Sequence, residues 1–244
     1  MTIEKERLSV DTFIPPWVRH EHEARFEFAS RFVKDKIVVD CACGSGLGST
    51  IFAQAGARQV LAYDISADDI ARARQKNNLP NLVFAVGDAT SLPCADQSAE
   101  VFISLETIEH LFADDKYLSE VRRVLKPDGV FICSTPNRSV TGPGTTIIDH
   151  PANKYHVREY SQEEFVDRLK KYFLSIEMFR QNPQANIKFQ IINFIAKYFS
   201  AKSAVRFGQF LKLPRLIFDR SSDHAVVSQK SGQEYEYLVA VCRI

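Results

Sequence analysis

Three aspartates follow three apolar runs of the chain, and their spacing could serve a ligand that contains a ribose. Asp40, Asp64 and Asp88 each stand at the end of such a run. The second lies 24 residues after the first, close to the roughly 20-residue interval between a dinucleotide-type glycine turn and its ribose-binding acid. A carboxylate at that place can accept hydrogen bonds from both ribose hydroxyls.

Small residues follow Asp40 directly and predict a turn between a strand and a helix. The turn reads Cys41-Ala42-Cys43-Gly44-Ser45-Gly46. Small side chains let a ligand approach the backbone, and the N-terminal N–H groups of the next helix would face it. A phosphate, a carboxylate or a ribose hydroxyl could lie there, but an ordinary strand-to-helix turn of an α/β domain reads in the same way.

The elements that must position these aspartates alternate between strand and helix along the first 140 residues. The predicted strands are 37–40, 59–64, 82–88, 99–105 and 130–135, with two later ones at 173–179 and 235–243. Helices are expected after the first, second and fourth of these strands. This alternation predicts a parallel sheet with helices on both faces.

Composition sets limits on the function. The chain has 244 residues, 45% hydrophobic and 25% charged, with a net charge of +1. These values are ordinary for a globular protein and indicate no nucleic-acid partner. Residues 1–9 carry no signal-like apolar run, so we expect a cytoplasmic protein. Five cysteines, without zinc-type spacing, predict neither a disulfide framework nor a zinc site.

The pattern divides the chain into four parts. We expect an N-terminal helical segment over the site (1–36), a core (37–182), a basic amphipathic helical insert (183–232) and a closing strand (233–244). His20, His22 and Arg25 lie on the first helix, either on a solvated face or against a ligand. Residues 183–218 contain six Lys or Arg and no acid, which suits a lid over the acceptor, a dimer face or a membrane-surface helix. A lid of this charge would fit a phosphate-bearing acceptor.

Six stretches, in this order, resemble the seven-stranded class I S-adenosylmethionine-dependent methyltransferases. They are Val39 to Gly46, Tyr63 to Ser66, Gly87 to Pro93, Glu106 to Leu111, Arg123 to Gly129 and Ser134 to Asn137. The resemblance implies an α/β, doubly wound, mostly parallel seven-stranded sheet with an antiparallel last strand and a helical insert before it. The wider pattern is also similar to methyltransferases of surface-polysaccharide, nucleotide-sugar and ubiquinone pathways.

The same resemblance implies which residues bind S-adenosylmethionine, or S-adenosylhomocysteine as the product. They are Asp40, Ala42, Cys43, Gly44, Gly46 and Leu105 at the methionyl end, Asp64 at the ribose, and Asp88 and Ala89 at the adenine, together with Ile65 after Asp64. Asp40 would attract the methionyl ammonium. Ala42 occupies the position where the family most often has its first glycine. We expect the alanine to cost little, because only the backbone must approach the cofactor there.

The donor carries its own leaving group, so the protein needs a base only when the acceptor loses a proton. His110 is the first candidate, against a structural role at a helix start, and His156 is the second, against a role in orienting its loop. Glu106, Glu109 and His110 could instead hold a divalent cation such as Mg²⁺, as in ubiquinone-pathway O-methyltransferases, or the two acids could cap a helix.

These residues predict in-line methylation of a hydroxyl on a small molecule or glycan. Two alternatives stay open. A nucleotide-dependent dehydrogenase would explain the glycine turn, and Tyr198 and Lys202 have the spacing of a short-chain dehydrogenase pair. A non-catalytic relative would bind the cofactor without transferring its methyl group.

Overall fold

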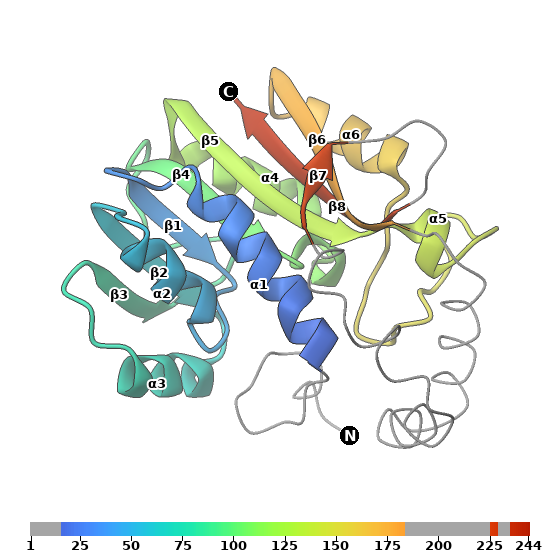
Figure 1. The fold of residues 1–244 in the computed structure, drawn as a ribbon. Coiled ribbons are helices and arrows are strands. Elements are labelled where there is room, and N and C mark those ends of the chain that lie inside the picture. The colour runs from blue at the N-terminus through green and yellow to red at the C-terminus, as the bar shows by residue number, and fades with distance from the viewer. Residues whose placement is uncertain (1–15, 184–224, 229–234) are drawn as a thin grey trace, which may run out of the picture.

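One eight-stranded sheet runs through the protein (Figure 1). The structure is a computed structural model, which describes residues 16–183, 225–228 and 235–244. The strands are β1 (Ile37–Cys41), β2 (Gln59–Asp64), β3 (Leu82–Val86), β4 (Ala99–Leu105), β5 (Leu125–Pro136), β6 (Ser175–Pro183), β7 (Val227–Ser228) and β8 (Tyr235–Arg243). Their order across the sheet is β3-β2-β1-β4-β5-β8-β6-β7.

The first five strands are parallel, and β8 runs antiparallel between β5 and β6. This confirms the predicted mostly parallel, doubly wound α/β sheet with an antiparallel last strand. The count differs by one because β7, a strand of two residues, pairs with the outer edge of β6. So short a strand has no hydrophobic period that a sequence pattern could reveal.

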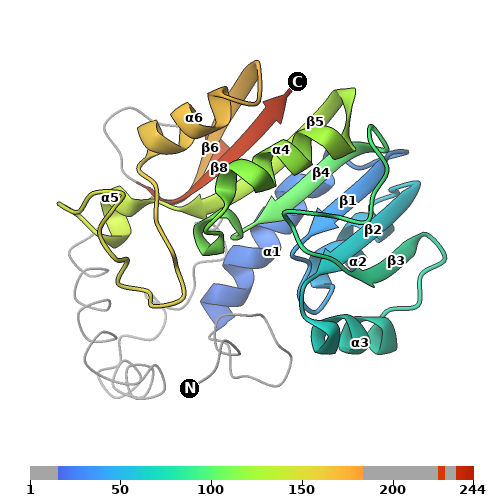
Figure 2. The same ribbon diagram turned by 180° about the vertical axis from the view of Figure 1, so that it is seen from behind.

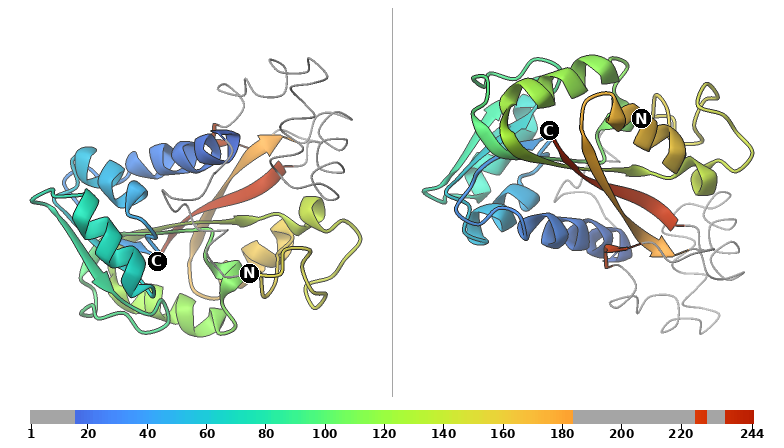
Figure 3. Two further views of the ribbon diagram at one scale, coloured as in Figure 1. Left: turned by 90° about the horizontal axis from the view of Figure 1, so that it is seen from below. Right: turned by 90° about the horizontal axis from the view of Figure 1, so that it is seen from above.

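Helices cover both faces of the sheet (Figures 1 and 2). They are α1 (Pro16–Ser30), α2 (Leu47–Gln54), α3 (Ala67–Lys76), α4 (Asp114–Val124), α5 (Arg138–Thr141) and α6 (Gln162–Lys170). A short 3₁₀ helix spans Ile108–His110. The edge-on views show α1 and α4 on opposite sides of the strands (Figure 3).

Each face of the sheet has its own hydrophobic core. Val38 packs in one core with residues of α1, α2 and α3, whereas Val39 packs in the other with residues of α4 and α6. Successive residues of a strand point to opposite faces, so a run of apolar residues serves both cores at once. This explains why β1 reads as a continuous apolar run.

The chain enters β5 earlier than its sequence predicts. We expected residues 126–129 to form a turn before a strand beginning at Val130. In the structure Leu125 pairs with Ala99, and Val130 pairs with Val101. Residues 126–129 therefore form an irregularity inside the strand, and Pro127 and Gly129 are residue types that strands tolerate at such places.

The parallel strands β1 to β5 end at one edge of the sheet, where open α/β folds bind their ligands. Apart from Pro183 and residues 225–228, the predicted insert (183–232) lies outside the described residues, as do Tyr198 and Lys202. Its three interpretations, and the division of the chain into four parts, stay predictions. Among the helices that the structure describes, none is long and apolar enough to cross a lipid bilayer.

Candidate functional site

The turn after β1 has a backbone that favours glycine at three positions. Ala42, Gly44 and Gly46 have φ of 64°, 51° and 80°. At Gly44 a Cβ atom would meet nothing within 4 Å, so open space lies over the backbone where a ligand could approach. Ala42 instead holds a side chain in the left-handed region, at a cost of about 1 kcal/mol. The expectation that alanine costs little there stays a prediction.

Gly46 has a packing role in the same turn. A Cβ atom on it would lie 2.6 Å from the ring of Phe84. The turn is therefore pressed against a side chain from the middle of β3, and the start of α2 is fixed relative to the sheet. A side chain at this position would push the helix N-terminus away from the site.

Asp64, at the end of β2, holds the turn in place. Its Oδ2 accepts a hydrogen bond of 2.9 Å from the backbone N–H of Gly44, and its Oδ1 accepts one of 2.9 Å from that of Ser66. Each carboxylate oxygen can accept a further bond. The chain thus orients the carboxylate at the turn, where it could accept hydrogen bonds from ribose hydroxyls.

Asp40 is buried beneath the turn and accepts a hydrogen bond from a side chain of α2. Its Oδ2 accepts a 2.5 Å hydrogen bond from the hydroxyl of Ser49 in α2. Burial raises the pKa of Asp40 to about 7, the hydroxyl of Ser49 opposes this rise, and the nearby charge of Asp64 adds to it. A cation arriving over the turn would stabilise the ionised form.

The other predicted cofactor residues lie around this edge of the sheet. Ile65, directly after β2, is 64% exposed, so its side chain could cover an aromatic base. Asp88 is exposed and accepts bonds from the N–H and hydroxyl of Thr90. Ala89, Cys43 and Leu105 are half-buried. Their contacts to a cofactor stay predictions.

Arg25 of α1 does not lie on a solvated face of its helix. Its side chain is buried, donates a 2.5 Å hydrogen bond to Oε1 of Gln181, and stacks over Tyr237 with 4.4 Å between guanidinium carbon and ring centre. Its Nε lies 3.9 Å from a carboxylate oxygen of Glu106. His20 is exposed and His22 half-buried. The alternation of charges on this helix could not reveal that Arg25 faces the sheet.

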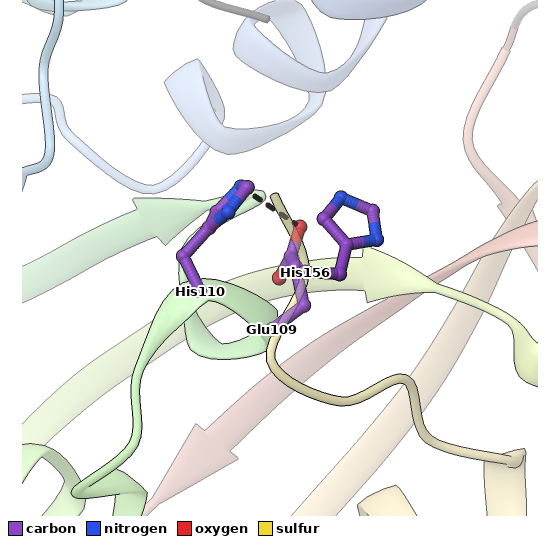
Figure 4. A group of neighbouring side chains, drawn as sticks. All are labelled: Glu109, His110 and His156. Carbon is purple, nitrogen blue, oxygen red and sulfur yellow. Dashed lines mark ion pairs between the residues drawn. The ribbon is translucent and has the colours of Figure 1, made fainter. Parts of the chain in front are cut away.

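A second group of polar side chains lies where β4 ends. Glu109, His110 and His156 each place one oxygen or nitrogen within 4.8 Å of the others. Figure 4 shows the carboxylate of Glu109 between the two imidazole rings, whose centres are 4.9 Å apart. Glu109 and His110 belong to the 3₁₀ helix after β4, and His156 belongs to the loop before α6.

This group differs from the predicted cation site of Glu106, Glu109 and His110. Glu106 turns to β5, where its Oε1 accepts a 2.6 Å bond from the hydroxyl of Ser134. Its φ of 50° sets it apart from the 3₁₀ helix that follows. His156 takes its place beside the other two. His110 ends the 3₁₀ helix and does not begin α4, so the predicted helix-start role does not apply.

Both histidines are held by their Nδ1 atoms. His110 Nδ1 lies 3.0 Å from the carbonyl oxygen of Tyr155, and His156 Nδ1 lies 2.5 Å from Oε1 of Glu159. A carbonyl and a carboxylate accept only, so both Nδ1 atoms carry a hydrogen and donate it. In the neutral rings the lone pair is then on Nε2.

Next to His156 is a cavity of about 430 Å³. It lies between α5, the loop 152–159 and the beginning of β8, and its polar lining includes Thr141, Glu159, Glu236 and Tyr237. Its described lining holds no Lys or Arg. The turn after β1, the Glu109 group and this cavity follow one another along the sheet edge, from β1 through β4 to β5 and β8.

Several residues of this edge escaped the sequence analysis. Ser49 lies nine residues after Asp40, on the first turn of a helix that directly follows the strand, and this position could have indicated a partner for the acid. Glu159 lies three residues after His156 in a polar loop, which is a weaker signal. Tyr237 reads as part of the last strand and gives no signal of its own.

The comparisons with known proteins agree on one family. The family model described as "Methyltransferase domain" matches residues 39–133. A probable S-adenosylmethionine-dependent methyltransferase of Mycolicibacterium smegmatis is 32% identical over 161 residues, 66% of this chain and 60% of that protein. A protein of the same description from Mycobacterium tuberculosis is 30% identical over 169 residues, 69% of this chain and 60% of the relative. The match thus spans 60% of each relative's length.

A solved structure supports the same fold. The crystal structure of an S-adenosylmethionine-dependent methyltransferase from Mesorhizobium loti superimposes with a TM-score of 0.61 over 92% of this chain and 100% of that chain. The sequence identity is 17%, so this likeness shows the fold alone.

Proposed function

Because residues 39–133 match the family model of the methyltransferase domain, we propose that this protein transfers the methyl group of S-adenosylmethionine to a hydroxyl of a small molecule or glycan. The observation that carries the proposal is the turn after β1. Its backbone lies open at Gly44, directly beside the oriented carboxylate of Asp64 and above the buried Asp40. These residues fit a ligand with a ribose at one end and an ammonium at the other.

Each part of the donor has a residue of suitable chemistry. Asp64 would accept hydrogen bonds from the ribose hydroxyls, and Ile65 would cover one face of the adenine. Asp40 would balance the positive charge of the methionyl ammonium. Ser49 keeps the Asp40 carboxylate turned toward the helix N-terminus, so its position would not change on binding.

The cavity beside His156 is the proposed acceptor site. Carboxylate, hydroxyl and phenol groups line it, together with the ring of Tyr237, a combination that suits the hydroxyls and apolar face of a sugar-like ring. The predicted phosphate-bearing acceptor would need the basic residues of the 183–218 segment.

In the transfer step, an acceptor oxygen forms a bond to the methyl carbon while the carbon–sulfur bond breaks. The electron pair of that bond goes to sulfur, which leaves neutral S-adenosylhomocysteine. The acceptor hydroxyl would lose its proton, and the group of Glu109, His110 and His156, of which His156 lines the cavity, would assist this loss. The donor already contains the leaving group, so most of the protein's contribution is alignment.

A methyl-transfer assay tests this function. Protein and donor labelled in the methyl group are incubated with nucleotide sugars, lipid-linked glycans, and phenolic or quinone precursors. We expect a labelled product with one acceptor class, formed by the wild type and lost in Asp64→Ala. Labelled product of equal yield in both proteins would refute the donor site.

Two other activities are separated by binding measurements. A dehydrogenase would bind NAD(P) tightly and S-adenosylhomocysteine not at all, and the family match speaks against it. A non-catalytic relative would bind S-adenosylhomocysteine but give no labelled product with any acceptor in the set.

A further inference from the structure

Glu109 presents a buried carboxylate oxygen that lacks a hydrogen-bond partner among the described residues. Its side chain is fully buried, and its Oε2 accepts a 3.1 Å bond from the hydroxyl of Thr135, while Oε1 accepts none. The Nε2 atom of His110 lies 4.0 Å from Oε1, too far for a hydrogen bond. A buried carboxylate oxygen is costly unless a proton or a cation satisfies it.

The two histidines beside this oxygen are oriented in the way that metal-binding histidines usually are. Such a histidine donates its other ring N–H to a carboxylate or a backbone carbonyl, which fixes the tautomer and raises the basicity of the ligating nitrogen. His156 has the carboxylate of Glu159 in that place, and His110 has the carbonyl of Tyr155. Two neighbouring histidines with this arrangement constitute an observation independent of the buried carboxylate.

We propose that Oε1 of Glu109 and the Nε2 atoms of His110 and His156 bind one divalent transition-metal ion. The proposed metal site depends only on the contacts of these three side chains. Its catalytic use rests on the proposed function: an ion there would polarise an acceptor hydroxyl at the mouth of the adjacent cavity and lower its pKa.

The donor set favours a metal other than the Mg²⁺ of the sequence-based hypothesis. Two imidazoles and one carboxylate form a set that Zn²⁺ and Fe²⁺ take in proteins, whereas Mg²⁺ prefers oxygen ligands. Three protein ligands also leave a position open for an acceptor oxygen, as in catalytic sites. We therefore expect Zn²⁺ or a similar ion.

Binding requires a small closure of the group. Ligand atoms about 2.0 Å from a tetrahedral Zn²⁺ are roughly 3.3 Å apart, and the three atoms here lie within 4.8 Å of one another. The Nδ2 atom of Asn153, now 3.0 Å from Nε2 of His156, must turn away. His156 is on a loop, which can make this shift more easily than the fully buried Glu109 in the 3₁₀ helix.

The test is a titration of the chelator-treated full-length protein with Co²⁺, which replaces Zn²⁺ and gives visible d–d absorption. We expect one ion per chain, displaced by an equivalent of Zn²⁺. Glu109→Gln and His156→Asn should weaken binding at least 100-fold, and Glu159→Gln should weaken it about 10- to 100-fold as a residue that orients a ligand. His150→Asn, an exposed histidine six positions from His156, is the matched control and should bind as the wild type does.

Two results would overturn the site: no stoichiometric Co²⁺ or Zn²⁺ binding by the wild type, or wild-type affinity in His156→Asn and Glu109→Gln. Circular dichroism and S-adenosylhomocysteine binding are measured on the same samples. If Glu109→Gln fails to fold, Glu159→Gln with an unchanged Co²⁺ affinity refutes the arrangement. If the protein binds S-adenosylhomocysteine but no Co²⁺, only the proposed metal site is refuted. If it binds Co²⁺ but no S-adenosylhomocysteine, only the proposed function is refuted.

Discussion

Raising the pH from 6 to 8 should strengthen S-adenosylhomocysteine binding, because Asp40 ionises within that range. Its pKa is about 7 in the ligand-free protein, raised mainly by burial. Only the ionised carboxylate balances the methionyl ammonium. Below the pKa, binding must first remove a proton, and the affinity falls by the fraction of molecules that are still protonated.

The magnitude follows from that fraction. With a pKa of about 7, the ionised share is about 0.09 at pH 6 and about 0.91 at pH 8. The dissociation constant should therefore fall about tenfold between these pH values, equivalent to about 1.4 kcal/mol.

The sign of the accompanying stability effect is also fixed. A carboxyl whose pKa is higher in the folded than in the unfolded protein binds more protons when folded, so the free energy of unfolding decreases as pH rises. For Asp40 the decrease occurs between its ordinary pKa of 3.8 and about 7, and it amounts to about 4 kcal/mol at most. Without ligand, Asp40→Asn should thus unfold at a higher temperature than the wild type at pH 8.

Isothermal titration calorimetry from pH 6 to 8 measures the affinity, with Asp40→Asn as the matched variant. The variant should bind more weakly at pH 8 and show no pH dependence. A wild-type affinity that is constant over this range, or an equal slope in Asp40→Asn, would refute the role given to Asp40.

Three further changes have expected outcomes. Gly46→Ala should lower the free energy of unfolding by about 2–3 kcal/mol in urea denaturation, because its Cβ would press on Phe84 and φ is positive. The control is Gly56→Ala, where φ is positive but no such contact exists. Its free energy of unfolding should fall by about 1 kcal/mol. Ala42→Gly should leave the free energy of unfolding unchanged or raise it by up to about 1 kcal/mol, and a decrease would show that the alanine is not strained. Arg25→Met should cost about 2–4 kcal/mol, since its buried partners lose their charge-assisted bonds, and a thermal midpoint equal to that of the wild type would contradict the buried network.

Much of the fold could be predicted because its determinants are local. The bounds of β2 and β4 agree with the prediction, since apolar runs and breakers mark both ends of each strand. Ser66 begins α3 by accepting a bond from the N–H of Asp69, a capping bond that serine commonly forms at a helix start. The irregular start of β5 and the two-residue β7 depend on pairing with distant strands, which no local pattern contains.

The candidate site could be predicted only in part, for the same reason. Asp40 and Asp64 meet at one edge because parallel strands end together. By contrast, His110 and His156 are 46 residues apart and belong to different connections, so their contact depends on how a loop packs. The burial of Arg25 likewise follows from the approach of α1 to β6 and β8, which the helix sequence does not encode by itself.

Calorimetric titration of the wild-type protein with S-adenosylhomocysteine tests the central claim most directly. We expect one molecule bound per chain and the loss of binding in Asp64→Ala, because the ribose hydroxyls then lose their acceptors. Circular dichroism of that variant, which must show a folded protein, is the control. Absence of binding to the folded wild type, or tight binding of NAD in its place, would contradict the account.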